Sequence, residues 1–358
     1  MIRLGLDASL RASGGVQVLL DSLERELANH PDVAHLVVAG PKPSTASNAV
    51  HVGEITAEIA ATHALDAVIY PGNSCGRTRK ETASILWPLS VAPAEPFALR
   101  RLFPGPIGIA KGQALKAKVA FALRRADALI FSSNYARSVL AGVAPAAATT
   151  PSTVVLPAPS ISSIDWSEPV DSQRYILWVS HGYPTKLAVE AIESYQSFAR
   201  QRKQRKAEIP RLLMAGSWPM DWYREDAEKV ADDGPGSVEF LGNQDQTALR
   251  ELYENATAYF FTSGSENASS YALLDALGGG VPTVSSSFSS MPEICGDAVL
   301  YANPLDYDAC GRALEELVAD SVLRKELSIR GRAQSQRLPK WTDIGNQVVC
   351  FAERIVTP

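Results

Sequence analysis

Two carboxylates, Glu266 and Asp275, lie in one strand, loop and helix pattern whose chemistry suits a ligand with two different ends. The apolar run 258–261 predicts a buried strand, and a helical pattern that begins near Tyr271 ends at the glycines of residues 278–280. Glu266 therefore lies beside the backbone amides of a helix start, which attract anions. Because a carboxylate repels phosphate, the amides would bind phosphates and the two acids would bind hydroxyl groups, as in a nucleotide sugar. The alternative is that Glu266 only caps the helix.

The sequence around these acids resembles a known donor-sugar motif. Residues 259–282, with DALGGGVPTVSSSFSSMPEICGDAVLYANPLD at residues 275–306, are similar to the corresponding segment of the retaining GT-B glycosyltransferases of group 1, or family 4 type. In that family two glutamates separated by seven residues hold the donor, the first through hexose hydroxyls and the second through the ribose. The resemblance implies these two roles for Glu266 and Asp275. Here eight residues separate the acids, and the second is the shorter aspartate.

The resemblance also implies donor contacts at other junctions between strands and helices. Lys186 follows the apolar run 175–180 and matches the family's basic residue at this place. A Gly-Gly pair after the first predicted strand, residues 2–6, resembles the family's glycine loop beside the donor diphosphate, although such a pair alone is more often a turn. Lys186 and Glu266 are the implied catalytic residues. The full implied donor site is Gly14, Gly15, His181, Lys186, Gly242, Asn243, Glu266, Asn267, Ala268, Ser269, Ser270 and Asp275.

Strand and helix patterns alternate along the whole chain, which is typical of parallel α/β sheets. The length of 358 residues is enough for two ordinary domains. We predict two Rossmann-like domains facing one cleft, the GT-B architecture that the resemblance implies. The predicted divisions are an acceptor-side domain at residues 1–170, a nucleotide-sugar-binding domain at 171–340, and a last helix at 341–358 that crosses back to the first domain.

Composition excludes several classes of protein. With 46% hydrophobic and 20% charged residues the chain is typical of soluble globular proteins, and no apolar run approaches the roughly 20 residues that cross a bilayer. The amino end does not resemble a signal peptide, and the four cysteines lack the paired spacing of a zinc site or disulfide framework. We therefore expect a cytoplasmic protein. The net charge of −5 argues against a nucleic-acid partner.

Charge is nevertheless uneven along the chain. Residues 1–160 carry 15 Lys plus Arg against 11 Asp plus Glu, a balance of +4, which leaves 19 against 28, or −9, for the rest. A basic cluster surrounds one predicted helix between residues 100 and 125. This cluster indicates contact with an anionic membrane, at its inner face, or with a phosphorylated acceptor. A solvated helix face is the alternative.

We predict a metal-independent enzyme without a cofactor that transfers a sugar from a nucleotide-diphosphate donor to a carbohydrate, lipid-linked or small-molecule acceptor. Asp306 and Asp308 form the one Asp-x-Asp spacing, and we interpret them as helix-start acids rather than as metal ligands. Two alternatives remain open. One is a GT-B relative with epimerase or phosphorylase chemistry. The other is a degenerate protein that binds nucleotide sugars without turnover, because Asp275 replaces a glutamate and residues 86–93 lack the histidine found in relatives.

Overall fold

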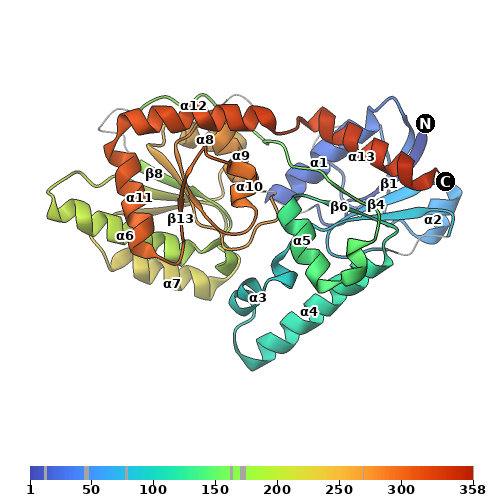
Figure 1. Ribbon diagram of the computed structural model, residues 1–358, viewed down its shortest axis with the longest axis horizontal. Coiled ribbons are helices and arrows are strands. Elements are labelled where there is room, and N and C mark those ends of the chain that lie inside the picture. Colours follow the sequence, from blue (N-terminus) through green and yellow to red (C-terminus); the bar gives the residue numbers. More distant parts are fainter. Residues whose placement is uncertain are drawn as a thin grey trace. The chain divides into compact units, whose positions relative to one another are not determined.

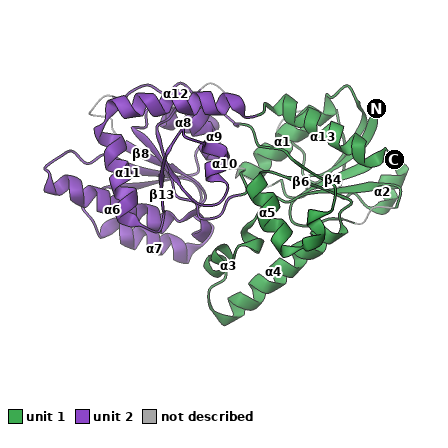
Figure 2. Cartoon of the chain, viewed as in Figure 1, with its two compact units in different colours: residues 1–158, 267–269, 339–358 green, residues 159–266, 270–338 purple. Residues whose placement is uncertain are grey.

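The computed structural model describes residues 1–11, 14–43, 48–76, 80–161, 164–169, 175–268 and 270–357. The chain forms two compact units, each built on its own parallel sheet (Figures 1 and 2). The first unit contains residues 1–158, 267–269 and 339–358, and the second contains residues 159–266 and 270–338. The prediction of two Rossmann-like α/β domains is confirmed.

The first unit has a seven-stranded sheet in the order β3-β2-β1-β4-β5-β6-β7, with every neighbouring pair parallel. Its central strands are almost fully buried because they consist of short, continuous apolar runs with helices on both faces. The strands are β1 (Ile2–Asp7), β2 (Val33–Ala39), β3 (Val50–Val52), β4 (Ala67–Pro71), β5 (Ala83–Trp87), β6 (Ala128–Phe131) and β7 (Ser152–Val154).

Helices of the first unit include one from the far end of the chain. The C-terminal helix α13 packs against α1, and Asn346 Oδ1 lies 2.9 Å from His30 Nε2. A side chain on Gly345 would meet Glu26 at 2.9 Å, so α13 approaches α1 closely there. The helices are α1 (Gly14–Ala28), α2 (Ala57–Thr62), α3 (Pro96–Leu102), α4 (Gly105–Arg125), α5 (Asn134–Val143) and α13 (Trp341–Val356).

The second unit has a six-stranded parallel sheet in the order β10-β9-β8-β11-β12-β13. Its strands are β8 (Tyr175–Val179), β9 (Arg211–Ala215), β10 (Val238–Gly242), β11 (Ala258–Phe261), β12 (Thr283–Ser286) and β13 (Leu300–Ala302). Its helices are α6 (Ala188–Gln204), α7 (Asp221–Asp232), α8 (Gln246–Glu254), α9 (Tyr271–Gly279), α10 (Met291–Cys295), α11 (Tyr307–Ala319) and α12 (Ser321–Arg337).

Local chemistry explains several helix boundaries. The side chains of Asp245 and Asp320 accept hydrogen bonds from the first-turn amides of α8 and α12, which satisfies donors that have no partner within a helix. Gly280, with φ of +73°, ends α9 in the left-handed conformation that glycine adopts without strain. The interpretation of Asp306 and Asp308 as helix-start acids is confirmed. Asp306 caps α11 by accepting from Ala309 N, and Asp308 accepts from the hydroxyl of Ser197 at 2.6 Å.

The predicted division between residues 170 and 171 lies outside the described residues. Contacts assign residues 159–161 and 164–169 to the second unit. The sequence did not predict β3, which has three residues at the edge of its sheet and no fully buried side chain. Within the described residues, no helix is long and apolar enough to span a bilayer.

Candidate functional site

Lys186 and Glu266 meet at the carboxyl edge of the second sheet. They follow β8 and β11, which are neighbouring parallel strands, so both junctions lie at the same edge. Lys186 is the last residue of a 3-10 turn (Pro184–Lys186) before α6, and its Nζ donates to Glu266 Oε1. The Glu266 carboxylate is buried, whereas the Lys186 side chain keeps about a quarter of its surface exposed. The pair therefore combines an accessible cation with an acceptor that little solvent reaches.

Thr262 joins the two junctions. Its hydroxyl lies 3.1 Å from the carbonyl oxygen of Lys186 and 3.2 Å from that of Leu187, and it accepts from the indole of Trp178 at 3.1 Å. The amide of Gly264 also donates to the carbonyl of Thr185 at 2.8 Å. These bonds restrain the backbone on both sides of the ion pair, so Lys186 and Glu266 are held by rigid supports.

Two serines that the sequence analysis did not single out bind the backbone of the loop that carries Glu266. Ser290, at the N-cap position of α10, donates its hydroxyl to the carbonyl of Glu266 at 3.0 Å, and Ser289 donates to that of Gly264 at 3.3 Å. They follow β12, the strand beside β11, so they reach the same sheet edge. The available signal was the serine-rich run 285–290, although no strand was predicted before it.

His181 lies just after β8, on the approach to Lys186. Its Nδ1 is 2.6 Å from Ser217 Oγ, and burial, together with the charge of Lys186, lowers the pKa of His181. The imidazole is therefore neutral at pH 7 and can both donate and accept a hydrogen bond. Gly182 next to it is pressed against the Trp218 ring, where an added Cβ would lie 2.2 Å from a ring carbon.

The loop between Glu266 and α9 is buried and unusual in its backbone. Ala268 has φ of +108°, which a residue with a side chain rarely adopts and which often marks functional loops. Contacts group Asn267 and Ala268 with the first unit, and Ser269 lies outside the described residues. Ser270 takes the N-cap position of α9 without a capping side-chain bond. Glu266 therefore does not take the N-cap position of α9, and its Oε1 accepts from Lys186.

The predicted base-side and glycine-loop residues lie in different units. Gly242 ends β10 with φ of +68°, its carbonyl accepts from the amide of Gly216 at 2.8 Å, and Asn243 beside it is exposed. Gly14 and Gly15 form the first residues of α1 in the first unit. Their contacts with a donor stay predictions.

Asp275 occupies a different setting from Glu266. It lies in the middle of α9 with only 3% of its surface exposed, and its carboxylate accepts three hydrogen bonds from Ser160 and Ile161. Burial raises the pKa of Asp275 to about 6, and these hydrogen bonds oppose the rise. Its assignment as a ribose ligand stays a prediction, but the sequence did not foresee these partners.

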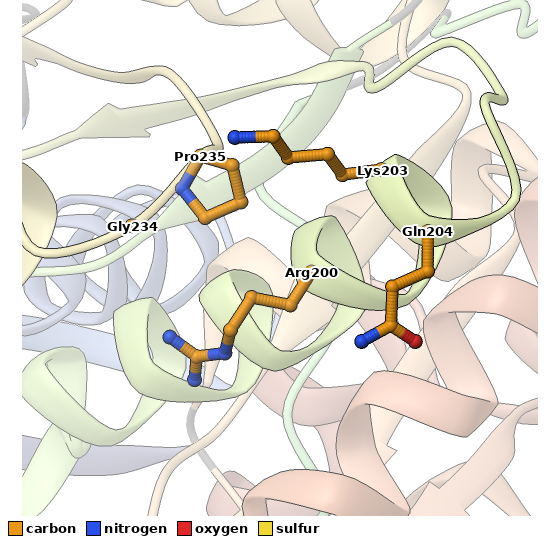
Figure 3. Close-up of a pocket in the computed structure, with 5 residues that line it drawn as sticks. All are labelled: Arg200, Lys203, Gln204, Gly234 and Pro235. Atoms are coloured by element: carbon orange, nitrogen blue, oxygen red, sulfur yellow. The ribbon is translucent and has the colours of Figure 1, made fainter.

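A surface pocket at the C-terminal end of α6 contains none of the predicted site residues. It is lined by Arg200, Lys203, Gln204, Gly234 and Pro235 (Figure 3). Exposed basic side chains at a helix C-terminus are favourable without a ligand, because they complement the negative end of the helix dipole. Among the described residues, no group of three or more His, Cys, Asp or Glu side chains is placed to hold a metal ion.

Comparison with known proteins finds sequence similarity within the second unit. Residues 162–334 match the family model described as glycosyl transferases group 1. O-antigen chain mannosyltransferase B of Escherichia coli is 27% identical over 179 residues, which are 49% of this chain and 45% of that protein. The chain thus spans about half the length of this curated relative.

Solved structures resemble the whole chain in fold. The sucrose-phosphate synthase of Thermosynechococcus elongatus superposes with a TM-score of 0.76 at 14% identity and covers 99% of both chains. Anabaena Alr3699/HepE, crystallised with UDP and glucose, gives a TM-score of 0.70 at 12% identity and covers 100% of both. At these identities the likeness shows the fold alone.

Proposed function

We propose that the protein transfers a sugar from a nucleotide-diphosphate sugar to an acceptor hydroxyl, with retention at the anomeric carbon, because residues 162–334 match the family model described as glycosyl transferases group 1. The observation that carries the proposal is the Lys186–Glu266 pair at the carboxyl edge of the sheet, within the matched segment. It offers one cation for phosphate and one buried carboxylate for sugar hydroxyls.

In the proposed reaction the bond between the anomeric carbon and the β-phosphate oxygen breaks, and its electron pair stays on the phosphate. The acceptor oxygen bonds to the anomeric carbon on the face that the phosphate leaves, and its proton passes to the departing phosphate oxygen. Lys186 and the first-turn amides of α9 stabilise the charge that develops on the leaving phosphate. Glu266 accepts hydrogen bonds from the hexose hydroxyls, which orients the ring.

The relatives support the classes of donor and acceptor. The Escherichia coli relative is named as a mannosyltransferase, and the Anabaena protein was crystallised with UDP and glucose. For this chain we propose a nucleoside diphosphate hexose as donor and a carbohydrate or lipid-linked acceptor.

A thermal-shift panel tests the proposal directly. UDP, GDP, ADP and their hexose derivatives are added to the protein, and at least one should raise its melting temperature, because a ligand that binds only the folded state stabilises it. Products formed from a nucleotide sugar without acceptor would indicate an epimerase, and use of a sugar phosphate would indicate a phosphorylase. Binding without transfer to any acceptor in a glycan and lipid panel would support the non-catalytic alternative. A panel in which no nucleotide binds would contradict the proposal.

We also expect transfer to proceed without a divalent metal. Metal-dependent transferases commonly use an Asp-x-Asp pair to neutralise the leaving diphosphate, but here Asp306 and Asp308 are engaged at the start of α11. Lys186 and the α9 amides are the proposed substitutes. The rate should be the same in excess EDTA as in magnesium or manganese. Loss of activity on chelation, restored by either metal, would show that this account of the leaving group is wrong.

Peripheral contact with an anionic membrane is a second proposal, and it rests on α4. This helix has five basic residues and no acidic one. Ile107 and Phe121 are exposed by 76% and 58%, and the exposed Lys111 and Lys118 lie between them at successive spacings of four, seven and three residues, which place all four on one face of the helix. An exposed stripe of apolar and basic side chains suits the interface of an anionic bilayer. In Figure 2 the amino-terminal end of α4 extends beyond the first unit's sheet.

Sedimentation with lipid vesicles tests this surface. The protein should bind vesicles that contain phosphatidylglycerol, bind pure phosphatidylcholine weakly, and lose binding as salt increases. The double variant Lys111→Glu with Lys118→Glu should abolish the difference in binding between the two kinds of vesicle. The matched control is Arg200→Glu with Lys203→Glu on α6, which changes the same charge elsewhere. The proposal would be contradicted if the two double variants bound phosphatidylglycerol vesicles equally well. It would also be contradicted if the parent protein bound both kinds of vesicle equally well.

A further inference from the structure

The carboxylate of Asp275 is enclosed by its own chain. Oδ1 accepts from the amides of Ser160 at 2.6 Å and Ile161 at 2.9 Å, and Oδ2 accepts from the Ser160 hydroxyl at 2.5 Å. Two successive backbone amides aimed at one oxygen form an anion-binding nest, and a charged acceptor strengthens each bond. These donors are 114 and 115 residues away in sequence, so they come from a separate segment that lies on α9.

That segment, which we call the α9 strap, consists of residues 159–161 and 164–166 of the second unit. Beyond Asp275 it is fastened to the C-terminal end of α9, where the Trp166 amide donates to the Gly279 carbonyl at 3.2 Å. The Trp166 indole donates to the carbonyl of Ala256 at 2.7 Å. A Cβ added to Gly279 would lie 2.2 Å from Ile164 Cγ2, so the strap approaches the helix more closely than any side chain there would allow. The glycines after Asp275 therefore do more than end a helix.

Ribose hydroxyls would have to compete with this arrangement. An ionised carboxylate offers about four lone-pair positions. Three are occupied, two on Oδ1 and one on Oδ2, and only 3% of the residue surface is exposed. A ribose diol that binds both carboxylate oxygens would first have to displace at least one of the two amide donors, of Ser160 or Ile161, from Oδ1.

We propose that Asp275 is the anchor of the α9 strap and not a ribose ligand, and that the aspartate, in place of the glutamate of related sequences, is matched in length to the strap. A glutamate would extend the carboxylate by one methylene into a close-packed contact. The strap would then have to move away from α9, and the bonds of Ser160, Ile161 and Trp166 would lengthen together. This inference rests on the proposed function only in the experiment that uses nucleotides as probes.

Thermal unfolding of Asp275→Glu is the sharpest test, because the change restores the family's residue. If Asp275 anchors the strap, the Asp275→Glu substitution should lower the melting temperature by roughly 5 °C or more, since overpacking a core is destabilising. The matched control is Asp297→Glu, whose side chain is exposed and should leave the melting temperature unchanged. A melting temperature of Asp275→Glu equal to that of the parent protein would overturn the inference.

Milder variants keep the inference testable if Asp275→Glu does not fold. Asp275→Asn retains an acceptor for the two amides, and Ser160→Ala removes only the hydroxyl donor. Each should lower the melting temperature, and the double variant should lose less than the sum of the two, because Asp275→Asn weakens the bond that Ser160→Ala removes. Additive losses would contradict a shared anchor.

Nucleotide binding separates the anchor from a ribose ligand. UDP, GDP and ADP are titrated beside their 2′-deoxy forms into the parent protein and Asp275→Asn. The ratio of ribo to deoxy affinity should be the same in both proteins. A ratio that falls about tenfold or more in Asp275→Asn, while Ser160→Ala leaves it unchanged, would establish the ribose role instead. If none of the nucleotides binds, the proposed function fails, and the unfolding measurements still decide whether Asp275 anchors the strap.

Discussion

A Glu266→Gln variant is expected to lose roughly 10²- to 10³-fold of the rate of sugar transfer, the size of effect seen when one preorganised polar group is removed from an active site. The amide keeps the shape of the side chain, and one acceptor, but loses the charge that would strengthen its hydrogen bonds to hexose hydroxyls. The measurement is the single-turnover rate with a saturating nucleotide sugar.

Affinity for the nucleoside diphosphate should not fall in the same variant, and we expect it to rise. In the structure Lys186 donates to Glu266, so bound phosphate has to compete with this carboxylate for the ammonium group. Removing the charge of Glu266 frees Lys186 for the phosphate. Weaker binding of the diphosphate in Glu266→Gln, or an unchanged transfer rate, would contradict the assignment of Glu266 to the sugar. Glu251→Gln on the exposed face of α8 is the matched control, and both quantities should stay at their parental values.

A Lys186→Met variant is expected to lower turnover by roughly 10²-fold, which corresponds to about 2.7 kcal/mol of the activation barrier. Lys186 would stabilise negative charge that grows on the leaving phosphate, so its removal should affect the transition state more than the bound donor. The expected pattern is therefore a large fall in kcat with a smaller rise in KM. An unchanged kcat with a raised KM would show that Lys186 contributes only to binding.

The ion pair complicates this variant, because Lys186→Met leaves the buried Glu266 carboxylate without its cation. A buried charge without its partner destabilises a protein strongly. The double variant Lys186→Met with Glu266→Gln removes both charges, and we expect it to regain most of the lost melting temperature while staying inactive. Recovery of activity in the double variant would contradict both catalytic roles. Lys203→Met on α6 is the control for loss of an exposed lysine in the same unit.

The strands that precede Lys186 and Glu266 could be predicted from the local pattern of apolar residues. The apolar runs before Lys186 and Glu266 became β8 and β11, because continuous apolar stretches of four or five residues are stable when both faces of a strand are buried. Parallel strands leave their carboxyl ends at one edge of a sheet, so polar residues that follow two neighbouring strands of this kind converge. The sequence therefore determined the fold class and brought Lys186 and Glu266 to the same edge of the sheet.

Only the tertiary structure decided which groups contact one another. Lys186 and Glu266 are 80 residues apart, and neither periodicity nor spacing indicates that they form a direct ion pair. From the sequence, both acids were likewise expected to bind ligand hydroxyls, Glu266 those of the hexose and Asp275 those of the ribose. The fold separates them. Glu266 faces a partly exposed lysine, whereas Asp275 is enclosed by amides from a segment 115 residues earlier. Burial and long-range hydrogen bonds depend on how distant segments close onto one helix, and local sequence does not encode that closure.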